Sequence, residues 1–206
     1  MKRLYLLLLC CIVLASQSYC GGAYGATALR KIKNWGLWTH GGEKDYELGV
    51  DDDTRVHDKP SACIRAIVEN PKGFASIEQE FSAEEFRGKH IRYSGAIKTN
   101  NVTDLCELWM KVSGPDGVVS FDNMEDRALK GTSEWKDCSI VLNVPKESRS
   151  IKMGFLVSGT GTGWLNSVAV EAVSDQVPVT GKPVAPGTFA SEGLKLQPSN
   201  LDFEKR

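Results

Sequence analysis

Short stretches of alternating apolar and polar residues, each ended by turn-forming residues, dominate the chain from residue 62 to residue 173. An alternation with a period of two is typical of β-strands, in which successive side chains point to opposite faces. The following segments are predicted to be strands: Ala62–Glu69, Phe74–Phe81, His90–Lys98, Leu105–Val112, Val118–Phe121, Cys138–Val144, Ile151–Ser158 and Trp164–Val173. One helical turn is expected at Ala83–Arg87, and no segment has a sustained period of 3.6 residues. The pattern predicts an all-β fold, an antiparallel sandwich or barrel.

The alternation also assigns a core face to each strand. The odd positions of Ile151–Val157 and the even positions of Cys138–Val144 are predicted to point inward. In Leu105–Val112 the even positions point inward, which leaves Trp109 on the outer face between Glu107 and Lys111. Outer strand positions are usually polar. Trp109 is therefore either covered by a loop or the tail, or a stacking platform for a ligand.

Residues 1–25 have the pattern of a secretory signal peptide. A basic start at Lys2 and Arg3 precedes an uncharged apolar run, Leu4–Ala15, and small residues follow it. The run is too short for a transmembrane helix, which needs about 20 apolar residues. We expect a secreted or periplasmic protein, cleaved between Ser18 and Ala26. A lipid anchor on Cys20 is the alternative, although the preceding residues do not follow a lipoprotein signal.

The mature chain is predicted to consist of one sandwich domain, residues 26–173, followed by a tail, residues 174–206. The tail begins with the Pro/Gly-rich, extended segment Val177–Gly187. Its last apolar-alternating piece, Pro198–Glu204, predicts a short strand that returns to a sheet edge. The same strand in a neighbouring protomer would give self-association through the tail.

Three cysteines, Cys63, Cys106 and Cys138, remain outside the predicted signal peptide. By the alternation, Cys106 and Cys138 both face the core and could form a disulfide if their strands are neighbours. Two free buried thiols are the alternative. Cys63 shares its predicted face with charged residues and is expected to point outward.

Charge and motifs narrow the function classes. The formal net charge of −1, with basic and acidic residues interspersed, favours neither nucleic acid nor an anionic membrane as a partner. The sequence has no GxSxG, HExxH, P-loop or Rossmann motif, so we expect no enzyme. His40 or His57 with a nearby carboxylate would be needed for a hydrolase. No cofactor is expected, and a structural calcium ion at Asp51–Asp53 is the alternative.

Aromatic residues are spread over the predicted strands and loops. Sugar rings stack on Trp and Tyr faces while polar side chains bind the hydroxyls, so such a set suits a carbohydrate cleft, although core packing also needs aromatic residues. The candidate ligand-binding residues are Trp38, His40, Trp109, Phe121, Asp122, Asn123 and Arg127.

Several motifs resemble a known bacterial domain. They are Phe81–Arg92, Leu108–Val112, Gly114–Gly117, Phe121–Met124, Lys130–Trp135 and Gly163–Leu165. This domain occurs in proteins often labelled AraC-type transcriptional regulators, and it looks like the galactose-binding-like jelly roll of carbohydrate-binding modules. The resemblance covers about Trp35 to Ala172 and implies a jelly-roll β-sandwich.

The sequence departs from the family pattern at two places. Ala128-Leu129 replaces the usual Pro-Ile, and Asn166-Ser167 replaces a usual acidic pair, which weakens the case for calcium. No helix-turn-helix is evident, so the resemblance does not imply a regulator. The first hypothesis is a non-catalytic module that binds a glycan or another small polar ligand. A protein-interaction domain is the second hypothesis and a hydrolase the third.

Overall fold

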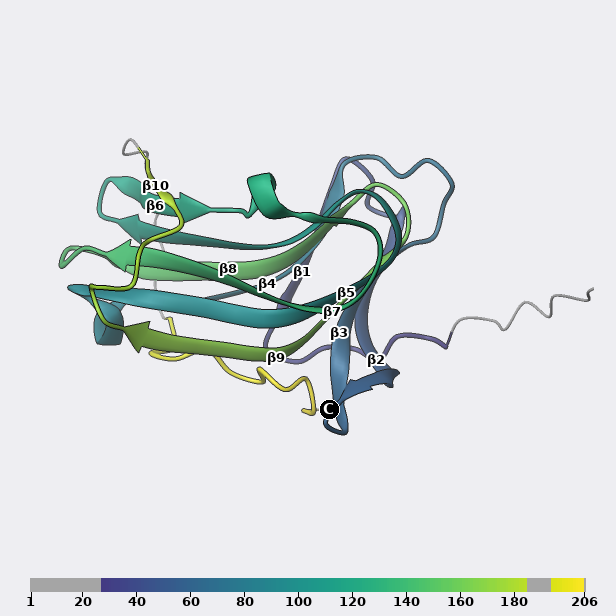
Figure 1. Ribbon diagram of the computed structural model, residues 1–206, viewed down its shortest axis with the longest axis horizontal. Coiled ribbons are helices and arrows are strands. Elements are labelled where there is room, and N and C mark those ends of the chain that lie inside the picture. The colour runs from purple at the N-terminus through teal and green to yellow at the C-terminus, as the bar shows by residue number, and fades with distance from the viewer. Residues whose placement is uncertain (1–26, 185–193, 206) are drawn as a thin grey trace, which may run out of the picture.

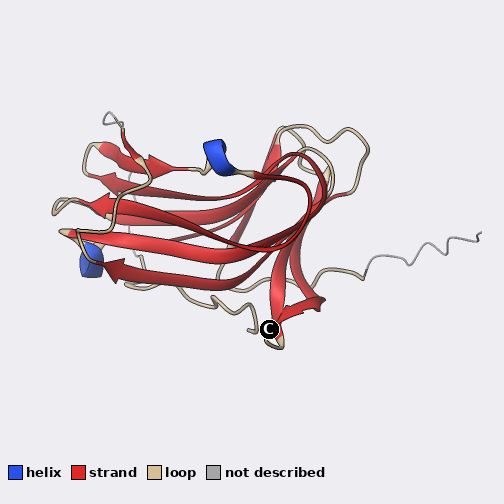
Figure 2. Cartoon of the chain, in the orientation of Figure 1, coloured by secondary structure: helices blue, strands red, loops and turns tan. Residues whose placement is uncertain are grey.

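The computed structural model describes residues 27–184 and 194–205, and its fold is an antiparallel jelly-roll β-sandwich (Figures 1 and 2). The strands are β1 (Gly36–His40), β2 (Tyr46–Val56), β3 (Lys59–Ala66), β4 (Phe74–Ser82), β5 (Lys89–Gly114), β6 (Gly117–Asp122), β7 (Leu129–Val144), β8 (Ser150–Ser158), β9 (Thr162–Val173) and β10 (Lys182–Pro183). The helices of this part are two 3₁₀ turns, η1 (Glu84–Phe86) and η2 (Glu125–Arg127). No helix among the described residues is long and apolar enough to cross a membrane. The predicted signal peptide, with Cys20, lies outside these residues.

The long strand β5 belongs to both layers of the sandwich. Its first half pairs with β7 and β9, and its second half pairs with β8 and β6. One layer therefore has the order β1-β4-β8-β5-β6, and the other has the order β2-β3-β9-β5-β7. The strands curl where the layers meet (Figure 1). We call the first layer the groove sheet, because its outer face carries the site described below.

The core between the two layers confirms the predicted inward faces. Ile151, Met153, Phe155 and Val157 of β8 are fully buried, as are the even positions of β5 from Cys106 to Val112. The even positions Ile140, Leu142 and Val144 of β7 are also fully buried. The period of two predicted these faces because each strand has one face buried in the core and one face toward solvent.

Two predicted strands, 90–98 and 105–112, are halves of the single strand β5. Asn101 has a left-handed backbone (φ 53°), and the pairing with β7 shifts register around it. The Asn101 N–H donates to Thr132 Oγ1 of β7 at 3.0 Å, and β5 continues through this irregularity as one strand. The expected helical turn is present as η1, where the Glu84 N–H donates to Ser82 Oγ.

The C-terminal segment returns to the sandwich, but as a turn and not as the predicted strand. Asn200 and Phe203 both have positive φ (56° and 58°), a conformation that a strand does not allow. The Phe203 ring is completely buried, with its centroid 5.7 Å from that of Trp35. Trp35 Nε1 donates to the carbonyl of Asn200 at 3.1 Å. The tail is thus anchored in the core by an aromatic pair.

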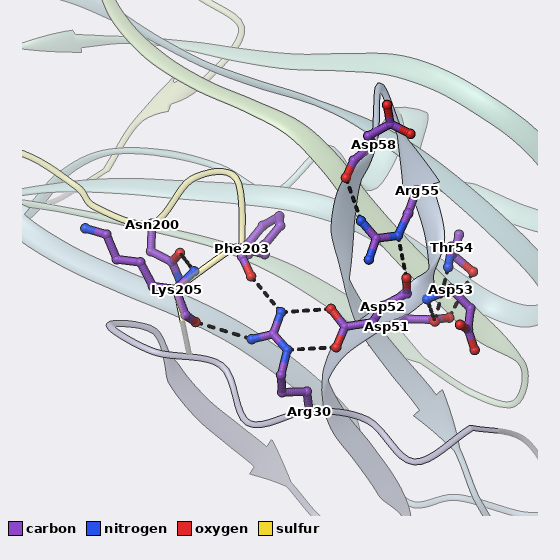
Figure 3. Close-up of polar contacts among 10 residues, drawn as sticks. All are labelled: Arg30, Asp51, Asp52, Asp53, Thr54, Arg55, Asp58, Asn200, Phe203 and Lys205. Atoms are coloured by element: carbon purple, nitrogen blue, oxygen red, sulfur yellow. Dashed lines mark hydrogen bonds and ion pairs between the residues drawn. The ribbon is translucent and has the colours of Figure 1, made fainter.

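The N-terminal segment also holds the tail, through the guanidinium of Arg30 (Figure 3). This group donates to both carboxylate oxygens of Asp52 at 2.8 and 3.0 Å, and to the carbonyl of Phe203 at 3.0 Å. A further bond reaches the carbonyl of Lys205. The linker that forms the first part of the tail adds β10 to the edge of β6, where Lys182 pairs with Phe121.

Of the two alternatives for Cys106 and Cys138, the structure has the free buried thiols, and the prediction for Cys63 is wrong. Cys106 and Cys138 are both buried but are not bonded to each other. Cys138 pairs with Gly95 in the first half of β5, whereas Cys106 lies in its second half and pairs with Val157, so the two are not cross-strand partners. Cys63 is 1% exposed and not outward-facing, because β3 is covered on both faces.

Candidate functional site

The outer face of the groove sheet is hollowed into a cleft of about 680 Å³, which we call the outer-face groove. This volume lies within the range of about 300–1,000 Å³ that is typical of small-molecule sites. Six apolar and seven polar side chains line the groove: Trp38, Phe74, Leu105, Trp109, Phe121 and Leu156, with Ser76, Glu78, Glu107, Lys111, Asn123, Lys152 and Ser158.

The register of the strands brings these side chains together. Trp38 of β1 is opposite Ser76 of β4, which in turn is opposite Leu156 of β8. Leu156 is opposite Glu107 of β5. Every second residue of each strand faces the same side of the sheet. Residues distant in sequence therefore form one continuous surface.

The indole of Trp109 forms the floor of the groove. It lies over Gly154 of β8 so closely that a Cβ atom there would come within 2.4–2.8 Å of ring atoms. Its Nε1 donates to Ser76 Oγ of β4 at 3.0 Å, which fixes the ring across β8. The side chain remains partly exposed, and no described tail residue lines the groove. The described part of the tail therefore does not cover Trp109.

Aromatic side chains stand on both walls. Trp38, on the edge strand β1, is 47% exposed, and Phe121, on β6 at the opposite side, is 37% exposed. Trp38 packs against Phe74 with ring centroids 5.2 Å apart in an edge-to-face arrangement. The His40 ring contacts both rings at a tilt, with centroids 5.7 and 5.5 Å away, but it does not line the groove.

Polar groups are distributed along the groove. Lys152 Nζ and Glu78 Oε1 form an ion pair at 2.6 Å. Ser158 Oγ, near the other end, donates to Asp104 Oδ2 at 2.6 Å. Glu107 lies on the floor beside Trp109, 3% exposed, and its Oε2 has no hydrogen-bond partner. Burial, with the nearby carboxylates, raises the pKa of Glu107 to about 8.

The structure divides the predicted site residues into two groups. Trp38, Trp109, Phe121 and Asn123 line the groove, and His40 does not line it but contacts the ring of Trp38. Sequence reasoning missed several lining residues: Phe74, Glu78, Glu107, Lys152 and Leu156. The alternation already placed Glu107 on the face of Trp109, but only the pairing of β4 and β8 with β5 adds the others.

Asp122 and Arg127 form a structural pair beside the groove. Asp122 is 7% exposed and accepts from Arg127 Nη2 at 2.7 Å, from the Met124 N–H and from the Thr180 hydroxyl. Burial raises the pKa of Asp122, but these hydrogen bonds outweigh it and hold the pKa below its usual value. The pair anchors the linker at Thr180 and so supports the wall that carries Phe121. A second hollow of about 480 Å³ lies along this linker.

In the acidic run Asp51–Asp53 of β2, a calcium candidate, the carboxylates of Asp51 and Asp52 accept hydrogen bonds from protein groups (Figure 3). Asp51 accepts from Trp164 Nε1 at 2.8 Å and from Thr54 Oγ1 at 2.9 Å. Burial raises the pKa of Asp51, but these bonds and two backbone N–H donors lower it below its usual value. Within residues 27–184 and 194–205, no three His, Cys, Asp or Glu side chains come together as metal ligands.

No family model matches the chain. A curated relative, described as an uncharacterised HTH-type transcriptional regulator YbfP of Bacillus subtilis (strain 168), is 36% identical over 178 residues, 85% of this chain. The chain spans 58% of the length of that relative. An AraC-type assignment is not supported, since the name specifies only the HTH type. In the described part of this chain, the helices are η1 and η2 alone, with no helix-turn-helix.

Solved structures of similar fold include the enzymatically active domain of tailspike protein 4 of bacteriophage CBA120. It is 15% identical with a TM-score of 0.52, over 69% of this chain and 20% of that chain. A xylan-binding domain of Paenibacillus barcinonensis is 14% identical with a TM-score of 0.47, over 70% of this chain and 90% of that chain. At these identities the tailspike match supports the fold alone.

Proposed function

We propose that this protein is a non-catalytic binding protein whose outer-face groove holds a glycan, with one sugar ring stacked on the indole of Trp109. The observation that carries the proposal is the fixed, uncovered indole on the groove floor, which lies over Gly154 and bonds to Ser76. A ring held in place before binding loses little conformational freedom when a ligand stacks on it.

The composition of the groove supports a sugar in particular. The C–H faces of a sugar are apolar and pack on aromatic rings, while its hydroxyls need donors and acceptors around the ring edge. Trp38, Trp109 and Phe121 offer the first kind of contact from the two walls and the floor. Glu107 and Asn123 offer the second. The net charge of −1 and the interspersed charges do not favour a nucleic acid in this place.

The proposal is tested by comparing two tryptophan variants, Trp109→Ala and Trp164→Ala. Trp164 is a matched control because it is also partly exposed and its Nε1 also donates to a side chain, Asp51, but it lies on β9 outside the groove. A glycan array selects the oligosaccharides that bind, and calorimetry measures their affinity. We expect Trp109→Ala to weaken binding about tenfold or more, as for a buried aromatic anchor, and Trp164→Ala to leave it within about twofold.

Circular dichroism and melting temperature establish that both variants keep the fold. Equal affinity in Trp109→Ala and the unsubstituted chain would refute the proposal. No binding across the array, together with a mass that increases with protein concentration, would instead favour a protein-interaction domain.

A further inference from the structure

The floor of the outer-face groove contains a buried acid that the fold does not satisfy. Glu107 occupies an outer position of β5, between Leu105 and Trp109, and its cross-strand partner on β8 is Leu156. The side chain lines the groove, yet its Oε2 is inaccessible to solvent and accepts no hydrogen bond among the described residues.

An apolar residue at this position would suit the fold better. A buried polar group without a hydrogen bond destabilises the folded state, because it has lost its contact with water and gained no partner. Its neighbours on this face are all apolar, namely Leu105, Leu156 and Trp109. An unsatisfied buried group at the bottom of a cleft therefore needs an explanation from outside the fold. Because Glu107 lines the groove, a rotation of its side chain toward a bound ligand would give the carboxyl the missing partner.

The surroundings of Glu107 favour its neutral form. The charged groups around it are Asp104 of β5, Asp122 of β6, and Glu125 and Arg127 of η2, three acids against one base. Its β8 neighbours, Leu156 and Ser158, carry no charge. These acids add to the effect of burial, so the carboxyl keeps its proton at neutral pH, with a pKa of about 8. A neutral carboxyl donates one hydrogen bond and accepts others, as a sugar hydroxyl does.

We propose that Glu107 is the residue that determines ligand specificity in the groove, through hydrogen bonds between its carboxyl group and a hydroxyl of the sugar stacked on Trp109. The inference rests on the proposed glycan-binding function. It adds that the groove selects among sugars by the arrangement of their hydroxyl groups. Stacking on an aromatic ring distinguishes sugars weakly. A buried polar group that needs a hydrogen-bond partner discriminates more strongly, because it rejects a sugar that cannot form that hydrogen bond.

The test compares Glu107→Gln with Glu107→Leu. Gln keeps the shape and both hydrogen-bonding functions, while Leu matches the two flanking leucines and removes them. Calorimetry at pH 6.5 uses xylohexaose, cellohexaose, β-1,4-galactotriose and the cationic glucosamine hexamer as probes. We expect Glu107→Leu to bind the preferred neutral probe about tenfold more weakly and to reduce the differences between probes. Glu107→Gln should stay within about threefold and keep the order of preference.

Several outcomes would overturn the inference. If Glu107→Leu keeps the affinity and the order of preference while Trp109→Ala loses binding, the groove binds glycans without selection by Glu107. If the glucosamine hexamer binds best and Glu107→Gln abolishes this, the residue selects a cation. If no probe binds the unsubstituted chain at millimolar concentration, both proposals fail for these sugars. Glu107→Met, measured in parallel, provides an unbranched apolar variant if the Leu variant does not fold.

Discussion

Trp109 and Gly154 show how single residues build the groove. The absence of a side chain at Gly154 lets the indole lie directly on β8. From the core side, the Tyr93 hydroxyl donates to the Gly154 carbonyl at 3.3 Å. Gly154 is thus held between a buried tyrosine of one layer and the indole on the outer face of the other. The platform is therefore coupled to the core and does not depend on loops.

Glu107 gives a pH dependence to stability at the residue scale. Its pKa is about 8 in the folded protein against an ordinary value of 4.5, so the folded state binds this proton more tightly than the unfolded state does. The stabilising effect of the proton is complete below about pH 4.5 and is lost as the pH rises toward 8. Above pH 8, both states have released the proton.

We expect the unsubstituted chain to lose stability relative to Glu107→Gln as the pH rises from 4.5 to 8. Above that range the difference should stay constant. Urea unfolding of both proteins at several pH values measures this difference, and contributions of other acids cancel in it. A difference that does not change with pH would show that Glu107 ionises normally in the folded protein.

At the scale of elements, β5 and the C-terminal turn decide the architecture. β5 serves both layers because the irregularity at Asn101 redirects it from one layer to the other. The turn at residues 199–203 closes the sandwich from the far end of the chain. Gln79 of β4 donates to the Ser199 carbonyl at 3.0 Å and accepts from the Ser199 N–H. The tail is thus part of the folded unit at its contacts with β4 and Trp35.

Phe203→Ala should destabilise the protein by about 3–5 kcal/mol, as for other phenylalanines truncated in a core. The reason is the cavity beside Trp35, since Phe203 is completely buried. Denaturant unfolding measures the loss. Leu196→Ala is the matched control from the same tail, because Leu196 is 48% exposed and should change stability by less than about 0.5 kcal/mol. Similar small effects of both variants would contradict the docking of the tail.

For the whole molecule, burial of the thiols is a direct consequence of the two-layer packing. Cys63, Cys106 and Cys138 all lie in the core as free thiols. Burial raises the pKa of all three thiols above the ordinary value, which suppresses the reactive thiolate. The sandwich therefore depends on packing and strand pairing, without a cross-link among these cysteines.

We expect a reducing agent to leave the melting temperature unchanged. In differential alkylation with peptide mapping, Cys63, Cys106 and Cys138 should react slowly in the native protein and completely after unfolding. Mapping by peptide separates these thiols from the cysteines near the N-terminus. A peptide that links Cys106 to Cys138 before reduction would contradict the structure.

The alternation predicted the site residues that lie on one strand. It could not predict those that join the site only through the pairing of strands. Trp109 was placed on the outer face with Glu107 because both lie on one strand, and Trp38 and Phe121 entered the candidate set as aromatic residues. Asp122 was also in the candidate set, but its side chain points away from the groove and pairs with Arg127. β1 and β2 were not predicted, and in β2 the polar run Asp51–Asp53 interrupts the alternation.

The sequence by itself determined the strand class, the inward faces and the outer position of Trp109, because a period of two is a local property of an extended chain. Only the tertiary structure decided which strands are neighbours. That choice joined Trp38, Trp109 and Phe121 in one groove, left Cys106 and Cys138 as free thiols and brought Phe203 to Trp35. Which strands are neighbours depends on how the apolar faces of all the strands can be buried together. The sequence of a single segment does not contain that information.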